Sequence, residues 1–191
     1  LLSDEPARPF AQNRSGISIG EAAAFALLVP GASARSQLLG VGESSDGFHM
    51  STPHPEGLGA IEAMAQALDR AGLDEGAIDY VNLHGTGTRA NDRVESLAVM
   101  QAFGRAVACS STKGATGHCL GAAGAIEALI CDLALEHQIV PGNVGIDLSD
   151  PELPLKVSLT TTARPLRRAL SNSFGFGGSN CTLILGTGHA D

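Results

Sequence analysis

The sequence predicts an α/β fold, in which short apolar strands alternate with helices. Apolar strand-like runs such as residues 77–84 are followed by segments that carry apolar side chains at helical spacing. Apolar residues make up 43% of the 191 residues and charged residues 17%, which is enough apolar material for a packed core. Glycine occurs 24 times, so we also expect many tight turns and close backbone approaches.

The first half of the chain contains four expected elements. Residues 20–30 (GEAAAFALLVP) form a short apolar run that is compatible with a helix or a buried strand. Residues 36–50 indicate a strand that leaves the core towards a Ser-rich loop. A helix is expected over 56–73, with Gly72 as its end signal, and a strand over 77–84.

The second half continues the alternation. A loop over 84–92 precedes a helix with Asn91 or Asp92 as N-cap and Gly104 as its end. The remaining expectations are a strand over 105–111, a helix over about 117–136, a Pro-rich loop over 141–155, and a strand, Gly-rich turn and strand over 169–186.

Charge and cysteine usage exclude several classes of protein. The net charge of −8 and the absence of Trp argue against nucleic-acid binding. The four cysteines show no CxxC spacing, which argues against a zinc ribbon and favours free thiols in a reducing cytosol. No apolar run reaches 18 residues and no signal-peptide pattern is found, so we expect a cytoplasmic location and no membrane contact. Because Leu1 stands where a Met would begin a gene product, we expect a processed or excised piece.

Three loops at strand ends are candidates for chemistry, because α/β proteins place ligands there. They are LHGTGTRAND (83–92), STKGATGHCLGAAG (111–124) and SNSFGFGGSN (171–180). Each also has a plain structural interpretation: a structural His, a surface Lys with a capping His, and a Gly-rich hairpin. A phosphate loop is disfavoured because the order of GxxxxGK[ST] is reversed.

Taken in this order, the three loops resemble the C-terminal half of β-ketoacyl-acyl-carrier-protein synthases, the condensing enzymes of the thiolase-like superfamily. The segment ARPFAQNRSGISIGEAAA resembles the family's RPFDxxRxGxxxGEGA pattern, with GEAAA as a departure that suggests a divergent branch. The resemblance covers roughly 8–186 of one domain, 1–191. It implies a mixed five-stranded sheet with covering helices, which completes a layered αβαβα architecture together with an N-terminal half that is not present here.

The resemblance implies the catalytic roles. His84 and His118 match the two histidines that polarise the malonyl thioester and stabilise the enolate formed on loss of carbon dioxide. Lys113 matches the active-site lysine, and Glu127 the glutamate that it helps to hold. The position of His118 at the start of a helix is expected to keep its imidazole neutral.

The remaining site residues are also implied by the resemblance. Thr86 and Thr88 match threonines that hydrogen-bond the pantetheine arm, with Ser51 nearby. Phe174 matches the gating Phe, and its backbone N–H would form part of the oxyanion hole. No metal and no bound cofactor are expected, because phosphopantetheine arrives on the acyl carrier protein. The expected partners are this carrier, the N-terminal half or a second synthase chain, and a second copy in a homodimer.

The resemblance places the nucleophilic Cys of this family in the N-terminal half, in a TACSS-like motif. The residues ACSS around Cys109 look like that motif, but a helix should follow the nucleophile directly to lower the pKa of its thiol, and STKGAT intervenes here. We expect Cys109 to be a buried, inert strand thiol. Arg89 and Arg93 are candidates for carrier docking, and the alternative is that they are ordinary solvated residues at a helix start. The main interpretation is an acyltransferase of fatty-acid type. The alternatives are a ketosynthase of a specialised polyketide or aryl polyene pathway, a non-catalytic partner like a chain-length factor, and an α/β hydrolase, which the missing GxSxG pattern disfavours.

Overall fold

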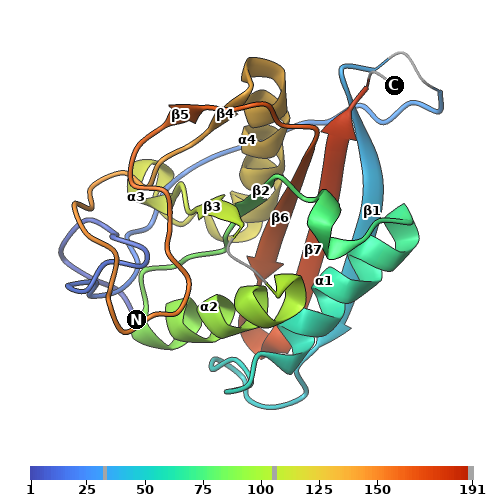
Figure 1. Ribbon diagram of the computed structural model, residues 1–191. Coiled ribbons are helices and arrows are strands. Elements are labelled where there is room, and N and C mark those ends of the chain that lie inside the picture. The colour runs from blue at the N-terminus through green and yellow to red at the C-terminus, as the bar shows by residue number, and fades with distance from the viewer. Residues whose placement is uncertain (32–33, 105–106, 189–191) are drawn as a thin grey trace.

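The computed structural model describes residues 1–31, 34–104 and 107–188. Its centre is a five-stranded sheet of strand order β1-β7-β6-β2-β3 (Figure 1). The strands are β1 (Ser36–Ser45), β2 (Tyr80–Asn82), β3 (Ala108–Ser110), β6 (Arg168–Phe174) and β7 (Ser179–Thr187). β1, β7 and β6 pair antiparallel, whereas β6, β2 and β3 run parallel. The mixed five-stranded sheet predicted from the sequence is therefore confirmed.

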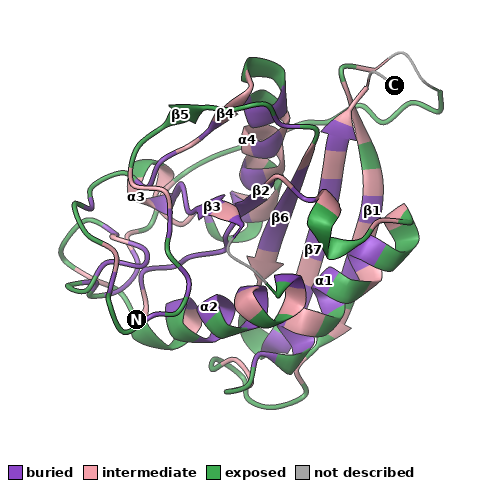
Figure 2. Cartoon of the chain, in the orientation of Figure 1, coloured by how far each residue is buried: buried purple, intermediate pink, exposed green. Residues whose placement is uncertain are grey.

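Helices cover both faces of this sheet. Alternate residues of a strand point to opposite faces, and Val81 packs with α1 (Leu58–Ala71) and α2 (Arg89–Phe103), whereas its neighbour Tyr80 packs with α4 (Ala123–His137). Figure 2 shows the buried side chains along the surfaces where these helices meet the sheet. The domain is thus a helix–sheet–helix sandwich with a core on each side of the sheet.

Small residues bring α1 close to the sheet. A Cβ atom at Gly40 or Gly42 of β1 would collide with the backbone carbonyls of α1, so only glycine permits this approach. The helix ends at Gly72, which adopts a left-handed conformation with φ 64° and donates its N–H to carbonyls of the last turn. The predicted helix and its end signal are both confirmed.

Two helices begin elsewhere than the sequence predicts. α2 starts at Arg89, three or four residues earlier than predicted, because the Thr88 side chain accepts the Asn91 N–H and acts as N-cap. α4 starts at Ala123, because the residues before it form the short helix α3 (Lys113–Thr116) and a 3-10 turn (Leu120–Ala122).

The prediction for residues 20–30 is wrong for the structure as it stands. This segment is neither a helix nor a buried strand but a mostly exposed coil. The sequence also missed the small strand pair β4 (Ile139–Val140) and β5 (Thr162–Ala163). The strand expected over 105–111 is observed as β3, and its first two residues lie outside the described part of the chain.

Candidate active site

The three candidate loops meet at one edge of the sheet. They follow β2, β3 and β6, and because these strands are parallel, their carboxyl ends lie together. A cavity of about 830 Å³ opens at this edge. Its lining includes every predicted site residue except the Lys and the Glu: Ser51, His84, Thr86, Thr88, His118 and Phe174.

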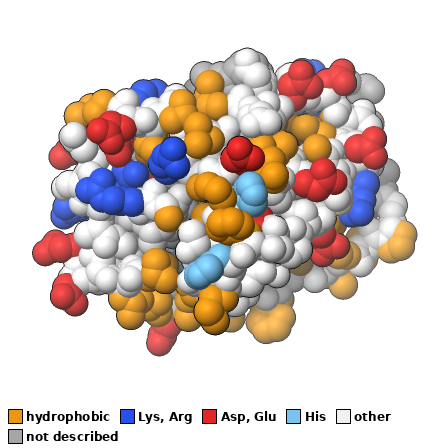
Figure 3. All heavy atoms as spheres, turned by 90° about the horizontal axis from the view of Figure 1, so that it is seen from below, with side chains coloured by type: hydrophobic (Ala, Val, Ile, Leu, Met, Phe, Trp, Pro, Cys, Tyr) orange, Lys and Arg blue, Asp and Glu red, His pale blue; other side chains and the backbone are white. Residues whose placement is uncertain are grey.

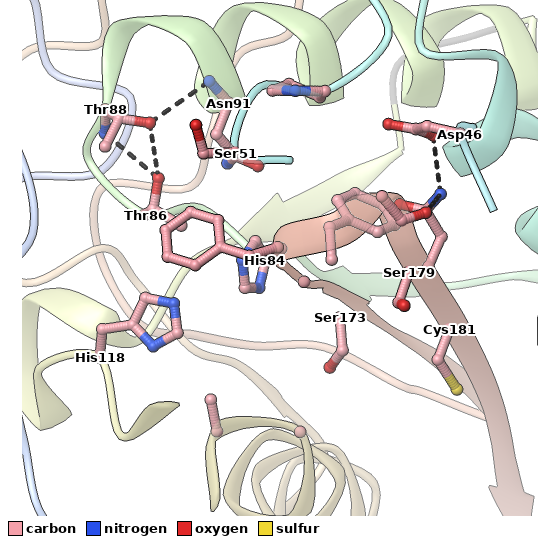
Figure 4. A pocket seen from close by; sticks show the side chains of 18 of the residues that line it. Asp46, Ser51, His84, Thr86, Thr88, Asn91, His118, Ser173, Ser179 and Cys181 are labelled. Atoms are coloured by element: carbon pink, nitrogen blue, oxygen red, sulfur yellow. Dashed lines mark hydrogen bonds between the residues drawn. The ribbon is translucent and has the colours of Figure 1, made fainter. Parts of the chain in front are cut away.

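The two histidines face one another across this cavity. The ring centroids of His84 and His118 lie 5.3 Å apart, with the rings nearly perpendicular, and Figure 4 shows both side chains beside the same open space. The ring of Phe174, at the end of β6, lies 5.7 Å from that of His84. The two rings are in edge-to-face contact, so a ligand atom in the cavity beside them would be close to both.

Lys113 and Glu127 lie beneath the cavity rather than in its wall. Lys113 is 1% exposed and Glu127 is 2% exposed, and the ammonium donates hydrogen bonds to a Glu127 carboxylate oxygen and to the His84 carbonyl. The Lys113 Nζ also lies 3.4 Å from Nδ1 of His84. Burial raises the pKa of Glu127 to about 7, and the neighbouring Lys113 counteracts part of this shift. The buried Lys113, which is held by Glu127, thus fixes the backbone and the ring of His84 through contacts to its carbonyl and to Nδ1.

Both histidines are neutral near pH 7. Burial, followed by the charge of Lys113 and the proximity of His118, holds the pKa of His84 well below its usual value. Burial and the charge of Lys113 lower the pKa of His118 to about 4. A neutral imidazole donates one hydrogen bond without bringing a cation into the site.

Local hydrogen bonds select the same tautomer in both rings. The backbone N–H of Leu120 donates to Nδ1 of His118 over 3.1 Å, which places the imidazole proton on Nε2. The Lys113 ammonium, which has only donors, lies against Nδ1 of His84 and has the same effect there. Each histidine is thus set to donate from Nε2.

The cause of the neutral His118 differs from the one predicted. The helix α4 begins at Ala123, so His118 lies five residues before its first turn, and burial together with Lys113 lowers its pKa. The expected dipole effect is confined to the first turn of a helix and does not reach this far.

The threonines form a polar wall above the histidines. The hydroxyls of Thr86 and Thr88 are 2.9 Å apart, and both line the cavity (Figure 4). Ser51 approaches from the exposed loop that follows β1. Such closely spaced small hydroxyls suit a narrow, amide-containing ligand such as the pantetheine arm, a role that stays a prediction.

Sequence reasoning missed the acidic residues that shape the His84 loop. Glu95 of α2 is 1% exposed and accepts the backbone N–H groups of His84, at 2.7 Å, and Gly85, at 2.8 Å. Asp92 accepts the N–H groups of Phe10 and Gly87. Two carboxylates three residues apart in the first turns of a helix, directly after the His loop, were the available signal.

Cys109 is a buried strand residue, as predicted. It is fully buried in β3, and burial raises the pKa of its thiol to about 12. A thiol with this pKa is almost never a thiolate at neutral pH, so it is a poor nucleophile.

The described residues offer neither a metal site nor a membrane span. Among them, no group of three or more His, Cys, Asp or Glu side chains is placed to hold a metal ion. Within the same ranges, none of the helices has both the length and the apolar composition needed to cross a bilayer.

The carboxyl edge of the sheet thus brings together His84 and His118 in the cavity wall and the buried Lys113 beneath it. Residues 35–147 match the family model described as β-ketoacyl synthase, C-terminal domain. The chain belongs to the β-ketoacyl synthase family and to the thiolase-like superfamily.

Relatives and solved structures agree with this assignment. The mitochondrial 3-oxoacyl-[acyl-carrier-protein] synthase of Arabidopsis thaliana is 41% identical over 94% of this chain and 42% of its own length. Synthase 2 of Rhizobium meliloti (strain 1021) is 40% identical over 97% of this chain and 47% of its own length. A structure of a ketosynthase in complex with its chain length factor from Xenorhabdus doucetiae superposes with a TM-score of 0.85 and 46% identity, covering 97% of this chain and 47% of that one. This chain therefore spans about half the length of the proteins that it matches.

Proposed function

We propose that this chain is the C-terminal half of a β-ketoacyl-acyl-carrier-protein synthase, an acyltransferase that joins an acyl thioester to malonyl-carrier protein. The observation that carries the proposal is the pair of neutral histidines, 5.3 Å apart, that face one cavity with their Nε2–H groups available. Donors of this kind stabilise negative charge on a thioester oxygen, which is the charge that decarboxylation creates.

The proposed chemistry has two steps. The malonyl thioester oxygen accepts hydrogen bonds from Nε2 of His84 and His118, the bond to the carboxylate breaks, and carbon dioxide leaves while its electron pair forms an enolate. The enolate carbon then attacks the carbonyl of an acyl group held on a Cys thiol, the C–S bond breaks, and the thiolate is released. Lys113 contributes by holding His84 in its tautomer and by balancing the Glu127 charge.

The acyl group requires a nucleophilic Cys, which the family resemblance places in the N-terminal half. Cys109 is buried in β3 with a raised thiol pKa, so it does not serve this purpose. The nucleophilic Cys is expected on the other half of the synthase, either on the same polypeptide or on a second chain. The Phe174 N–H is proposed as one donor of the oxyanion hole for the second step.

Both substrates are proposed to arrive as thioesters of phosphopantetheine on an acyl carrier protein, so the chain itself needs no bound cofactor. Thr86, Thr88 and Ser51 would line the path of this arm. Arg89 and Arg93 are exposed at the start of α2, next to the cavity-lining residues Ala90 and Asn91, and Figure 3 shows several basic side chains close together on one side of the molecule seen from below. An acidic carrier would be attracted to that side. We also propose a homodimer and a cytoplasmic location for the complete enzyme.

A specialised pathway is the second candidate, because solved relatives include the Xenorhabdus doucetiae ketosynthase with its chain length factor and, at 34% identity, an ishigamide ketosynthase/chain length factor. A purely non-catalytic partner role is disfavoured, because this chain keeps His84, His118 and Lys113 in one connected arrangement. A partner without catalysis has no need of all three.

The proposal is tested by release of carbon dioxide from malonyl-carrier protein, with this chain complemented by the N-terminal half of a synthase. Loss of one charge-stabilising donor typically slows such a step by about 100- to 1,000-fold. The rate of carbon dioxide release is therefore expected to fall by this factor in His84→Ala and in His118→Ala. His137→Ala, at the exposed end of α4, is the matched control and should retain the rate. Unchanged release in both site variants would overturn the site assignment.

A further inference from the structure

Arg14 is a buried cation that lies between two buried carboxylates. Its side chain is 3% exposed, and the side chains of Asp92 and Asp150 are 0% and 4% exposed. Nη1 of Arg14 donates to a carboxylate oxygen of Asp150, and Nε lies 3.5 Å from Oδ2 of Asp92. Because buried charges need a partner of opposite sign, this one guanidinium compensates both carboxylates. None of the three side chains lines the cavity, so they act on the site only through other residues.

Asp92 connects Arg14 to the loop that carries the two threonines of the cavity wall. Its Oδ1 atom accepts the backbone N–H of Gly87 over 3.2 Å. Gly87 is buried and stands between Thr86 and Thr88, whose hydroxyls lie side by side at the cavity in Figure 4. Its φ of 78° is a conformation that glycine adopts without strain. The hydrogen bond from Gly87 to Asp92 therefore fixes the backbone at the point where the two hydroxyls are presented.

The other end of this loop has a separate anchor. Glu95 accepts the backbone N–H groups of His84 and Gly85. Within the described residues, Arg14 forms an ion pair with Asp92 and none with Glu95. The two ends of the loop are thus held by different carboxylates, the histidine end by Glu95 and the threonine end by Asp92.

Burial works against the charge that Asp92 needs in order to hold the loop. Burial raises the pKa of Asp92, whereas hydrogen bonds from the Phe10 N–H and the Asn91 side chain, followed by the charge of Arg14, lower it again. A charged carboxylate accepts a hydrogen bond more strongly than a neutral carboxyl group does. Without Arg14, Asp92 shifts towards its neutral form and its hydrogen bond from Gly87 becomes weaker.

We propose that Arg14 is a positioning residue that acts through Asp92 on the loop segment 86–88. It keeps the two threonine hydroxyls aligned with the path proposed for the pantetheine arm. This inference rests on the proposed function. It predicts a change in substrate binding and none in the chemical step, because the histidine end of the loop is held separately by Glu95.

Steady-state kinetics of carbon dioxide release from malonyl-carrier protein test this division. They are measured with this chain complemented by the N-terminal half of a synthase. In Arg14→Gln, KM is expected to rise by about five- to tenfold, the factor that corresponds to one weakened hydrogen bond, while kcat stays within about twofold. Asp150→Asn is the matched control, because it removes the charge of the other partner of Arg14 and leaves Asp92 with its cation. It should leave both constants unchanged.

Hydrogen–deuterium exchange of the backbone amides, resolved by residue in the same complexes, tests the positioning independently of activity. The Gly87 amide should exchange at least about tenfold faster in Arg14→Gln than in the parent, whereas the amides of His84 and Gly85 should keep their rates. Arg14→Gln leaves two buried carboxylates without a cation and is expected to be less stable. The double variant Arg14→Gln/Asp150→Asn removes one of these charges, so it should be more stable and show the same changes in KM and at Gly87.

The outcomes separate this inference from the proposed function. An unchanged exchange rate at Gly87 in both the single and the double variant would overturn the inference. A KM that rises as much in Asp150→Asn as in Arg14→Gln, or a loss confined to kcat, would also overturn it, because Arg14 would then act only through the stability of the fold. Faster exchange at Gly87 in complexes whose parent releases no carbon dioxide would support the hold of Arg14 on the loop and contradict the proposed function.

Discussion

Replacing Lys113 with Met should destabilise the domain strongly. The ammonium is 1% exposed, and its partner Glu127 is 2% exposed. Removing one member of a buried ion pair typically costs about 3–5 kcal/mol, because the other charge stays buried without compensation. We expect a loss of this size in the free energy of unfolding at pH 8, where Glu127, with a pKa of about 7, is ionised in the parent.

The size of this loss should depend on pH. Burial raises the pKa of Glu127 and Lys113 lowers it, so the pKa of Glu127 rises further in the variant. A carboxyl whose pKa is higher in the folded state stabilises the fold at low pH, and this contribution is lost as the pH rises through the folded pKa. The deficit of the variant is therefore smallest near pH 5 and grows above pH 7 by up to about 1.4 kcal/mol per pH unit.

Urea unfolding followed by circular dichroism at pH 5 and pH 8 measures this deficit. The double variant Lys113→Met/Glu127→Gln is the control, because it removes the uncompensated carboxylate together with the ammonium. At pH 8 it should keep only a smaller loss, from the bond to the His84 carbonyl, and this loss should not grow above pH 7 because the carboxyl is gone. A Lys113→Met deficit that is equal at both pH values, or that persists in full in the double variant, would refute the reasoning.

Two further predictions concern the cysteines and the packing of the helices. Burial raises the pKa of Cys109 to about 12, so iodoacetamide at pH 8 should modify the half-buried Cys181 well before Cys109, and equal rates by mass spectrometry would contradict this. Gly42→Ala should lower the free energy of unfolding by about 1–3 kcal/mol, because its Cβ would collide with the backbone of α1. Gly76→Ala, where a Cβ meets nothing within 4 Å, is the matched control, and equal effects in urea unfolding would argue against such close packing.

The sequence identified the three loops as candidates because apolar runs ending in small polar residues are visible in the letters alone. The grouping of His84, His118 and Thr86 in one site came from the family resemblance, and the structure places all three in one cavity. The parallel strands explain this, because their carboxyl ends lie at one edge of the sheet. The catalytic roles of the three residues remain predictions.

The supporting residues were less accessible to sequence reasoning. The side chain of Glu95, on a helix that begins at Arg89, reaches the His84 loop, and the predicted N-cap at Asn91 or Asp92 gave no reason to expect this contact. The N-cap hydrogen bond of Thr88 decides this start, and it competes with equally plausible caps nearby. Helix boundaries depend on such single bonds, so sequence patterns define them poorly.

The error at residues 20–30 has a different origin. Apolar composition correctly indicates a segment that favours burial, but burial also requires a surface to pack against. Within the described chain that surface is missing, and Phe25 and Leu27 are exposed as a result. Sequence patterns report what a segment prefers and not which chain or domain provides its partner.

The account depends most directly on two neutral imidazoles that carry their protons on Nε2. Nitrogen-15 NMR of the histidine rings, recorded from pH 8 down to pH 4, observes both the charge and the tautomer. We predict that His84 gains a proton only well below pH 6.5, that His118 gains one only near pH 4, and that both carry the proton on Nε2 at pH 7. An imidazolium at pH 6 for either residue, or a proton on Nδ1 at pH 7, would contradict the account.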